Sequence, residues 1–266
     1  MLFGQIDYIN CLPVTLPLIE DKPADLQLRL GNPNELNCAY QGGELDVGAM
    51  SAHFYLQGGF EIFPTLSISS CGPVGSVFLF SKRQPEDLND ALVGLPAASA
   101  SSVNLLKVLL FEMGVKPRFT VTSAAQSRSA EPLAGLDACL MLGDDALRAD
   151  RRFGSDPNLV RRDMGQWWFE RYSLPMVFGV WAARSSWASE HAEQFADLGV
   201  LLAQSVDKGL KGHFEAVLAA AQAATGLDRQ RLQVYFQEEL DYRFKPEHRQ
   251  ALALFGSLCR EHKLLG

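Results

Sequence analysis

Short apolar runs alternate with helix-like segments along most of the chain, and this alternation constrains the fold more than any other feature. Runs such as 45–50 and 138–142 are typical of short buried strands. Helix-entry signals lie between the runs, for example Asn32 directly before Pro33, where an Asn cap precedes a proline of the first turn. Strands that alternate with helices are typical of α/β proteins, so we expect an α/β fold.

The length of 266 residues allows one large domain or two modest lobes, at roughly 100–200 residues per domain. The polar stretch Lys82–Asp87 interrupts the apolar pattern and is a candidate crossing into a second lobe. The apolar run Leu174–Arg184 is a candidate return. We therefore predict one lobe, with the N-terminal strands and C-terminal helices, from residues 1–82 and 182–266, and a second from residues 83–181.

The net charge of −7 and the sequence pI of about 5.3 exclude a basic nucleic-acid binder, because phosphate binding needs clustered positive charge. No apolar stretch reaches the roughly 20 residues that span a bilayer, and the N-terminus lacks secretory-leader features. We therefore expect a cytoplasmic protein without a membrane partner. The five cysteines form no CxxC and no Cys/His cluster, and glycine-rich nucleotide loops are absent, so we predict no metal and no cofactor. The sequence predicts no particular oligomeric state.

Small polar residues recur where the expected strands end. In open α/β sheets ligands bind outside these ends, where helix N-termini direct N–H groups at anions. Each residue alone could be only a helix cap or a turn residue, but their number favours a pocket for a small anionic organic ligand. The residues are Asn10, Ser51, Ser70, Ser76, Ser99, Ser101, Ser102, Thr122 and Asp144.

Three further features have a structural and a functional interpretation. The turn Gly72–Gly75 exposes backbone N–H groups, so Gly75 is a binding candidate. Asp144 could act as a general base with a raised pKa or cap a helix after Gly143, and we favour the cap. Tryptophan side chains could line a pocket for a planar ring or belong to the core: Trp167, Trp168 and Trp181.

Several segments occur in an order known from one family: Ile6–Pro13, Gly31–Pro33, Cys71–Val77, Ser99–Leu106, Gly143–Leu147 and Asp163–Ala182. Together they resemble the menaquinone-pathway chorismate dehydratases of the futalosine route. The resemblance implies a two-lobed fold similar to type II periplasmic binding proteins, with chorismate in the cleft between the lobes. It also implies hinge closure on the ligand, which we place near residues 80–85 and 178–184.

The family reaction removes water from chorismate and gives 3-[(1-carboxyvinyl)oxy]benzoate. By resemblance, Asn10 and Ser76 are the catalytic candidates, which orient the leaving hydroxyl or the enolpyruvyl carboxylate. The sequence holds no obvious strong base for this site, so a substrate carboxylate is the candidate base. Ala100 stands where the family often has Arg, which leaves the charge partner of the bound carboxylate open. The substrate-binding candidates are Ser51, Ser70, Gly75, Ser99, Ser101, Ser102 and Asp144.

Three alternatives remain at this point. A solute-binding protein for a small carboxylate would share the fold and the cleft without any chemistry. The sister dihydroxynaphthoate synthase of the same pathway typically carries a Cys-Pro-Asn-Asp type motif where this chain has Asn10-Cys11-Leu12-Pro13. A transcription-factor effector domain of this fold would need a DNA-binding helix pair, which the sequence does not visibly supply.

Overall fold

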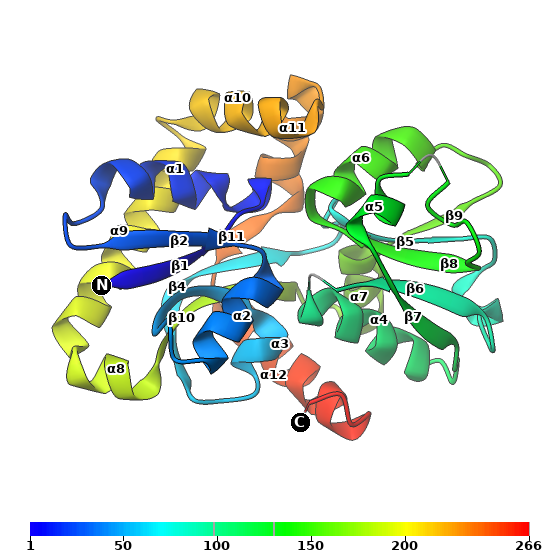
Figure 1. Cartoon of the computed structure of the whole chain (residues 1–266), viewed down its shortest axis with the longest axis horizontal. Helices are drawn as coiled ribbons and strands as arrows, with labels where there is room; N and C mark the ends of the chain where they lie inside the picture. The colour runs from blue at the N-terminus through cyan, green and yellow to red at the C-terminus, as the bar shows by residue number, and fades with distance from the viewer. Residues whose placement is uncertain (98, 130, 266) are drawn as a thin grey trace.

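Two β-sheets with helices packed around them divide the molecule into two lobes (Figure 1). The structure is a computed structural model that describes residues 1–97, 99–129 and 131–265. Parallel and antiparallel strand pairs occur in both sheets, and helices separate most of the strands along the chain. The predicted α/β fold is therefore confirmed.

The first lobe contains a sheet of order β11-β4-β10-β3-β1-β2. Strand β1 pairs in parallel with β2 and β3, whereas β10 is antiparallel to β3 and β4. All five residues of β3 are buried, because the strand is central in the sheet. The strands are β1 (Leu2–Ile6), β2 (Gln27–Gly31), β3 (Val47–Ser51), β4 (Phe60–Ser70), β10 (Met176–Arg184) and β11 (Asp241–Arg243).

The helices of the first lobe come from both ends of the chain. Helix α2 begins as predicted at Pro33, and Asn32 forms a capping box with Glu35. The α-helices are α1 (Leu12–Asp21), α2 (Pro33–Gln41), α3 (Ala52–Tyr55), α8 (Ser185–Glu190), α9 (Ala192–Leu210), α10 (Phe214–Thr225), α11 (Arg229–Val234) and α12 (Pro246–Glu261). Two shorter turns complete the set, the 3₁₀ turn Ile9–Cys11 and the π-helical turn Tyr235–Glu239.

The second lobe contains a sheet of order β7-β6-β8-β5-β9. Strand β5 is buried throughout: antiparallel β8 and β9 pair with both its edges, and the helices Gly143–Phe153 and Met164–Tyr172 pack against it. The strands are β5 (Val77–Ser81), β6 (Leu92–Pro96), β7 (Arg118–Thr122), β8 (Ala138–Leu142) and β9 (Val160–Asp163). The helices are α4 (Ala100–Phe111), α5 (Ala124–Ser127), α6 (Gly143–Phe153) and α7 (Met164–Tyr172), with a 3₁₀ turn at Pro85–Asp87.

The chain changes sheets at residues 71–76 and 173–175, which differs from the predicted boundaries at 82 and 182 and from the predicted hinge positions. Strand β5 pairs only within the second sheet, and β10 pairs only within the first. The polar stretch that suggested a linker continues the second lobe, where the Lys82 N–H donates to the Asp137 carbonyl at 2.9 Å. Its polarity reflects solvent exposure and does not mark a crossing.

The segment after α9 also departs from the prediction of helices alone. Its π-helical turn and strand β11 bring this segment beside β4 and the first crossing. Trp168 and Trp181 belong to the core, where their indole N–H groups donate to the Pro175 carbonyl and the Gln5 amide oxygen. Within the described ranges, no helix has both the length and the apolar character needed to cross a membrane.

Candidate functional site

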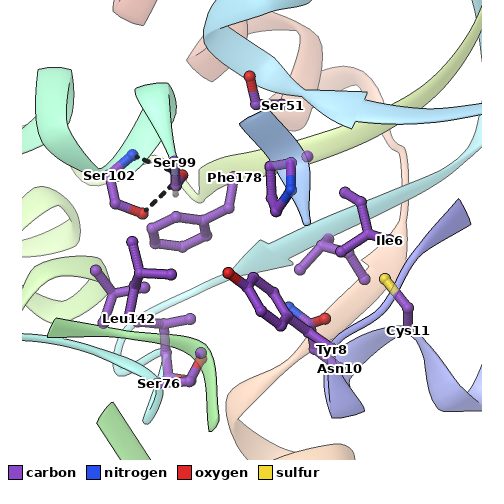
Figure 2. Close-up of a pocket in the computed structure, with 16 residues that line it drawn as sticks. Ile6, Tyr8, Asn10, Cys11, Ser51, Ser76, Ser99, Ser102, Leu142 and Phe178 are labelled. Atoms are coloured by element: carbon purple, nitrogen blue, oxygen red, sulfur yellow. Dashed lines mark hydrogen bonds between the residues drawn. The ribbon is translucent and has the colours of Figure 1, made fainter. Parts of the chain in front are cut away.

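A pocket of about 50 Å³ lies between the lobes, close to the ends of strands from both sheets (Figure 2). Its polar lining side chains are Tyr8, Asn10, Cys11, Ser51, Ser76, Ser99 and Ser102, and apolar residues such as Leu142 and Phe178 complete the wall. The described lining includes no Asp, Glu, His, Lys or Arg. The pocket therefore presents hydroxyl and amide groups on an apolar background.

Asn10 lies in the 3₁₀ turn between β1 and α1, shortly after the carboxyl end of β1. The Tyr242 hydroxyl donates to the Asn10 backbone carbonyl at 2.8 Å and fixes the turn from the C-terminal segment. The side-chain oxygen Oδ1 of Asn10 is buried and has no hydrogen-bond partner among the described residues. A buried amide oxygen without a partner is costly, so a ligand donor in the pocket would stabilise it.

Ser76 enters the pocket from the first crossing, directly before β5. Its side chain is buried, and Oγ accepts a hydrogen bond from the Tyr235 hydroxyl at 3.0 Å. Among the described residues, the one other hydrogen bond of this hydroxyl is its donation to the Val74 carbonyl, at 3.4 Å. Ser76 Oγ therefore accepts one well-formed hydrogen bond, whereas its own proton has only a distant acceptor.

Serines at the N-termini of two helices also line the pocket. Ser99 caps α4 by accepting the Ser102 N–H at 3.5 Å, and both side chains line the pocket. Ser51 caps α3 by accepting the Phe54 N–H at 3.2 Å, and Asn37 donates to the same oxygen at 3.1 Å. Ser51 and Ser99 therefore both cap a helix and line the pocket.

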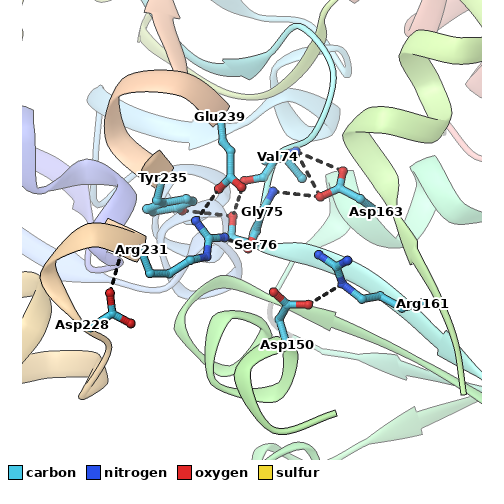
Figure 3. A network of polar contacts seen from close by, with 10 residues as sticks. All are labelled: Val74, Gly75, Ser76, Asp150, Arg161, Asp163, Asp228, Arg231, Tyr235 and Glu239. Atoms are coloured by element: carbon cyan, nitrogen blue, oxygen red, sulfur yellow. Dashed lines mark hydrogen bonds and ion pairs between the residues drawn. The ribbon is translucent and has the colours of Figure 1, made fainter. Parts of the chain in front are cut away.

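Ser70, the last residue of β4, and Gly75, in the first crossing, both lie outside the pocket lining. The Ser70 hydroxyl donates to the Gly72 carbonyl at 3.1 Å. The N–H groups of Val74 and Gly75 donate to the Asp163 carboxylate, at 2.8 Å for Gly75 (Figure 3). The N–H of Gly75, which we expected to face a ligand, is therefore occupied by a side chain of the protein.

Ser101 and Asp144 also lie outside the pocket lining and connect the two lobes. The Ser101 hydroxyl oxygen accepts the His53 N–H at 2.9 Å, and the Asp144 carboxylate accepts the Ile9 N–H at 3.3 Å. Asp144 is not the helix cap we favoured, because α6 begins at Gly143 and has no side-chain cap. Burial raises the pKa of Asp144, and the Ile9 N–H partly opposes this shift.

A larger cavity of about 460 Å³ adjoins the pocket and shares Tyr8 and Leu142 with it. Asp144, Arg128 and Arg148 line this outer cavity. Arg148 pairs with the neighbouring Asp145 at 2.9 Å, whereas exposed Arg128 forms no ion pair within the described part of the chain. Asp7 and Asp145 also line the outer cavity, so charged side chains of both signs lie next to the pocket.

Residues 1–261 match the family model described as menaquinone biosynthesis. The chain belongs to the menaquinone biosynthesis family. This membership confirms the family to which the sequence motifs pointed.

A curated relative of this family member is a chorismate dehydratase of Thermus thermophilus, which is 36% identical over 169 residues. The match covers 57% of this chain and 59% of that protein, which is less than two thirds of its length.

Solved structures share the fold of this family member. A protein of Archaeoglobus fulgidus has a TM-score of 0.78 at 18% identity, with 99% of this chain and 97% of that chain covered. The periplasmic aliphatic sulphonate binding protein of Escherichia coli has a TM-score of 0.70 at 14% identity, with 100% and 93% covered. A Candida albicans protein described as having the generic periplasmic binding protein fold has a TM-score of 0.65 at 10% identity, with 100% and 95% covered. The periplasmic-binding-protein-like fold is therefore confirmed.

Among the residues that the structure describes, one group of side chains has donor atoms close enough to suggest a metal: Cys71, Asp241 and His248, within 4.8 Å of one another. The Lys245 backbone N–H donates to Nδ1 of His248 at 3.3 Å, so the neutral ring carries its proton on Nε2, which faces Asp241. Lys245 Nζ also occupies the Asp241 carboxylate at 3.0 Å. We assign Asp241 and His248 to a polar network with Lys245 that supports the start of α12.

Sequence reasoning missed Tyr235 and Tyr242, which hold the two catalytic candidates from the C-terminal segment. Both are buried aromatic residues in a segment with an amphipathic pattern, so the sequence pattern does not distinguish them from core residues. It also missed Tyr8, although this residue lies next to the motif that contains Asn10. Proximity to that motif was the one available signal.

Proposed function

We propose that this protein is a chorismate dehydratase, which converts chorismate to 3-[(1-carboxyvinyl)oxy]benzoate and water. The observation that carries the proposal is the convergence of Asn10 and Ser76, from opposite lobes, on one mostly apolar pocket. Family membership and the Thermus thermophilus relative support the same assignment. The substrate is a small molecule, and we propose a cytoplasmic enzyme.

The reaction is a 1,2-elimination that makes the ring aromatic. The C–H bond breaks at the ring carbon that bears the enolpyruvyl ether, and its electron pair forms the new ring π-bond. The neighbouring C–O bond breaks, and the hydroxyl leaves as water after it accepts a proton. Because the proton lost is vinylogous to the ring carboxylate, the site needs to hold the ring and assist two proton movements.

The described lining offers no strong base for the first proton movement. Burial raises the pKa of the Cys11 thiol and of the Tyr8 phenol, so both groups stay protonated near neutral pH. The proton therefore goes to a carboxylate of the substrate, held close by the pocket. Asn10 orients the reacting groups through the buried Oδ1, and Ser76 donates toward the leaving oxygen.

The substrate carboxylates meet neutral donors in this pocket. Helix α4 begins at Ala100, behind the cap Ser99, and its first N–H groups and positive dipole end favour an anion. Ser102 adds a hydroxyl at the same place. This arrangement offsets the loss of the Arg that the family often has at position 100.

The test is incubation of the purified protein with chorismate, followed by ultraviolet absorbance and product mass. Loss of one water with formation of an aromatic product supports the proposal. A folded protein that binds chorismate and leaves it unchanged would favour a solute-binding protein. Turnover of the larger cyclic substrate of the sister synthase in place of chorismate would favour that enzyme.

A further inference from the structure

A buried tyrosine from the C-terminal segment lies directly behind Ser76. We propose that Tyr235 is a positioning residue that directs the Ser76 hydroxyl proton into the pocket, an inference that rests on the proposed function. Tyr235 is 1% exposed, and its hydroxyl oxygen lies 3.0 Å from Ser76 Oγ (Figure 3). It is absent from the pocket lining, so it acts on a ligand only through Ser76.

The direction of this hydrogen bond follows from the available acceptors. Ser76 Oγ is the one hydrogen-bond partner of the Tyr235 hydroxyl among the described residues. If Ser76 donated to Tyr235, the phenol proton would be buried without an acceptor, which is costly. Tyr235 therefore donates, and burial favours its protonated form by raising its pKa.

Because Ser76 Oγ already accepts a hydrogen bond from Tyr235, the Ser76 hydroxyl proton needs an acceptor of its own. The Val74 carbonyl is the alternative acceptor inside the protein, but at 3.4 Å it lies near the limit of a hydrogen bond. A ligand oxygen at normal distance in the pocket would be the better acceptor. Donation from Tyr235 also polarises the Ser76 O–H bond and makes it a stronger donor. The pair is therefore suited to assist departure of the hydroxyl as water.

The local structure holds Tyr235 in this place. Tyr235 begins the π-helical turn, in which the Leu240 N–H donates to the Tyr235 carbonyl at 3.2 Å. Arg231 lies over the Tyr235 ring, pairs with Glu239 at 2.8 Å and donates to the Gly75 carbonyl at 3.3 Å. The same arginine therefore contacts the residue before Ser76 and the turn that carries Tyr235. π-Helical turns often occur at functional sites.

The experiment compares Tyr235→Phe with Tyr40→Phe in chorismate turnover. Tyr40 is also fully buried, and its hydroxyl donates to the Ala49 carbonyl at 3.2 Å, away from the pocket lining. Both variants lose one buried hydroxyl. We expect Tyr235→Phe to lower kcat about tenfold with little change in KM, because one hydrogen bond to the reacting group is weakened. Tyr40→Phe should retain the wild-type kcat.

A Ser76→Ala background separates positioning from general stability. If Tyr235 acts through Ser76, Tyr235→Phe causes no further loss of kcat in that background. A wild-type kcat in Tyr235→Phe, or the same fold-loss with and without Ser76, would overturn the inference. An inactive wild type would overturn the proposed function and this inference together. An active wild type with an unaffected Tyr235→Phe would overturn only the inference.

A second substitution covers the case in which Tyr235→Phe does not fold. Incorporation of 3-fluorotyrosine at position 235 keeps the hydroxyl and makes it a stronger donor. We expect a higher kcat than in the wild type, because Ser76 becomes more polarised. An unchanged kcat in this folded protein would overturn the inference.

Discussion

A methyl group at Gly75, in the first crossing, should destabilise the protein more than a methyl group at a glycine of similar conformation in open space. The φ of +66° at Gly75 lies in the left-handed region, and a Cβ there would clash with Glu239 Oε2. Gly43 has a similar φ of +72°, but a Cβ there would meet nothing within 4 Å. Gly43→Ala therefore carries the backbone strain alone, and Gly75→Ala adds the clash.

The magnitudes follow from these contacts. The left-handed conformation costs a non-glycine residue roughly 1–2 kcal/mol, and this cost is common to both variants. The clash also displaces the Arg231–Glu239 ion pair, whose side chains are 24% and 17% exposed. Loss of hydrogen bonds between such charged groups costs about 1.5–3 kcal/mol more. At about 2–4 °C per kcal/mol, the Tm of Gly75→Ala should lie about 3–12 °C below that of Gly43→Ala.

The assay is thermal unfolding of the wild type and both variants, followed by circular dichroism and calorimetry. We predict two separate decreases in Tm, with the larger one for Gly75→Ala. Equal decreases would refute the reasoning, because they would show that Glu239 moves away from a Cβ at no cost. In that case the contact between the π-helical turn and the first crossing would not restrain the site.

Three further predictions concern the charges and the cleft. Arg128→Ala should raise KM for chorismate about two- to fivefold without changing kcat, because exposed Arg128 attracts the anionic substrate in the outer cavity. An unchanged KM at low salt would contradict this prediction. Burial would raise the pKa of Asp241, but hydrogen bonds from His248, the Arg243 N–H and Lys245 outweigh it and hold this pKa well below its usual range. The stability that the charged Asp241 contributes is therefore fully present above its usual pKa of about 4 and is lost as the pH falls toward its lower pKa in the folded protein. Below about pH 4, the Tm of the wild type should therefore fall more steeply than the Tm of Asp241→Asn. Parallel curves of Tm against pH would argue against this. Finally, a pocket of about 50 Å³ is smaller than the roughly 300–1,000 Å³ of typical ligand sites, so the lobes should separate to admit chorismate. Identical X-ray scattering profiles with and without chorismate would contradict this prediction.

The parts of the fold that depend on local signals were predictable from the sequence. The Asn32 cap, the proline of the first turn of α1 and the buried strand β5 all follow from residues close together in the chain. The crossing was placed too late, because the turn Gly72–Gly75 and a polar surface stretch are both typical of chain reversals. Choosing between them requires knowledge of which strands pair with β5.

The candidate site was predictable only where it lies at strand ends and helix entries. Asn10 follows β1 as expected and reaches the pocket, whereas Ser76 reaches it from the amino end of β5 and not from the end where a strand finishes. Ser101 and Asp144 bond to the opposite lobe. Those contacts join residues far apart in sequence, so no local pattern records them. Tyr235 likewise contacts Ser76 across 159 positions.

The most direct test of the account is the rate at which the protein removes water from chorismate, measured by product mass for the wild type, Asn10→Ala and Ser205→Ala. Ser205 is a buried serine of α9 outside the pocket lining, so its variant controls for the loss of a buried polar side chain. The account predicts 3-[(1-carboxyvinyl)oxy]benzoate from the wild type and from Ser205→Ala at similar rates, and a rate about 100-fold lower for Asn10→Ala. Unchanged chorismate with the folded wild type, or wild-type turnover by Asn10→Ala, would contradict it.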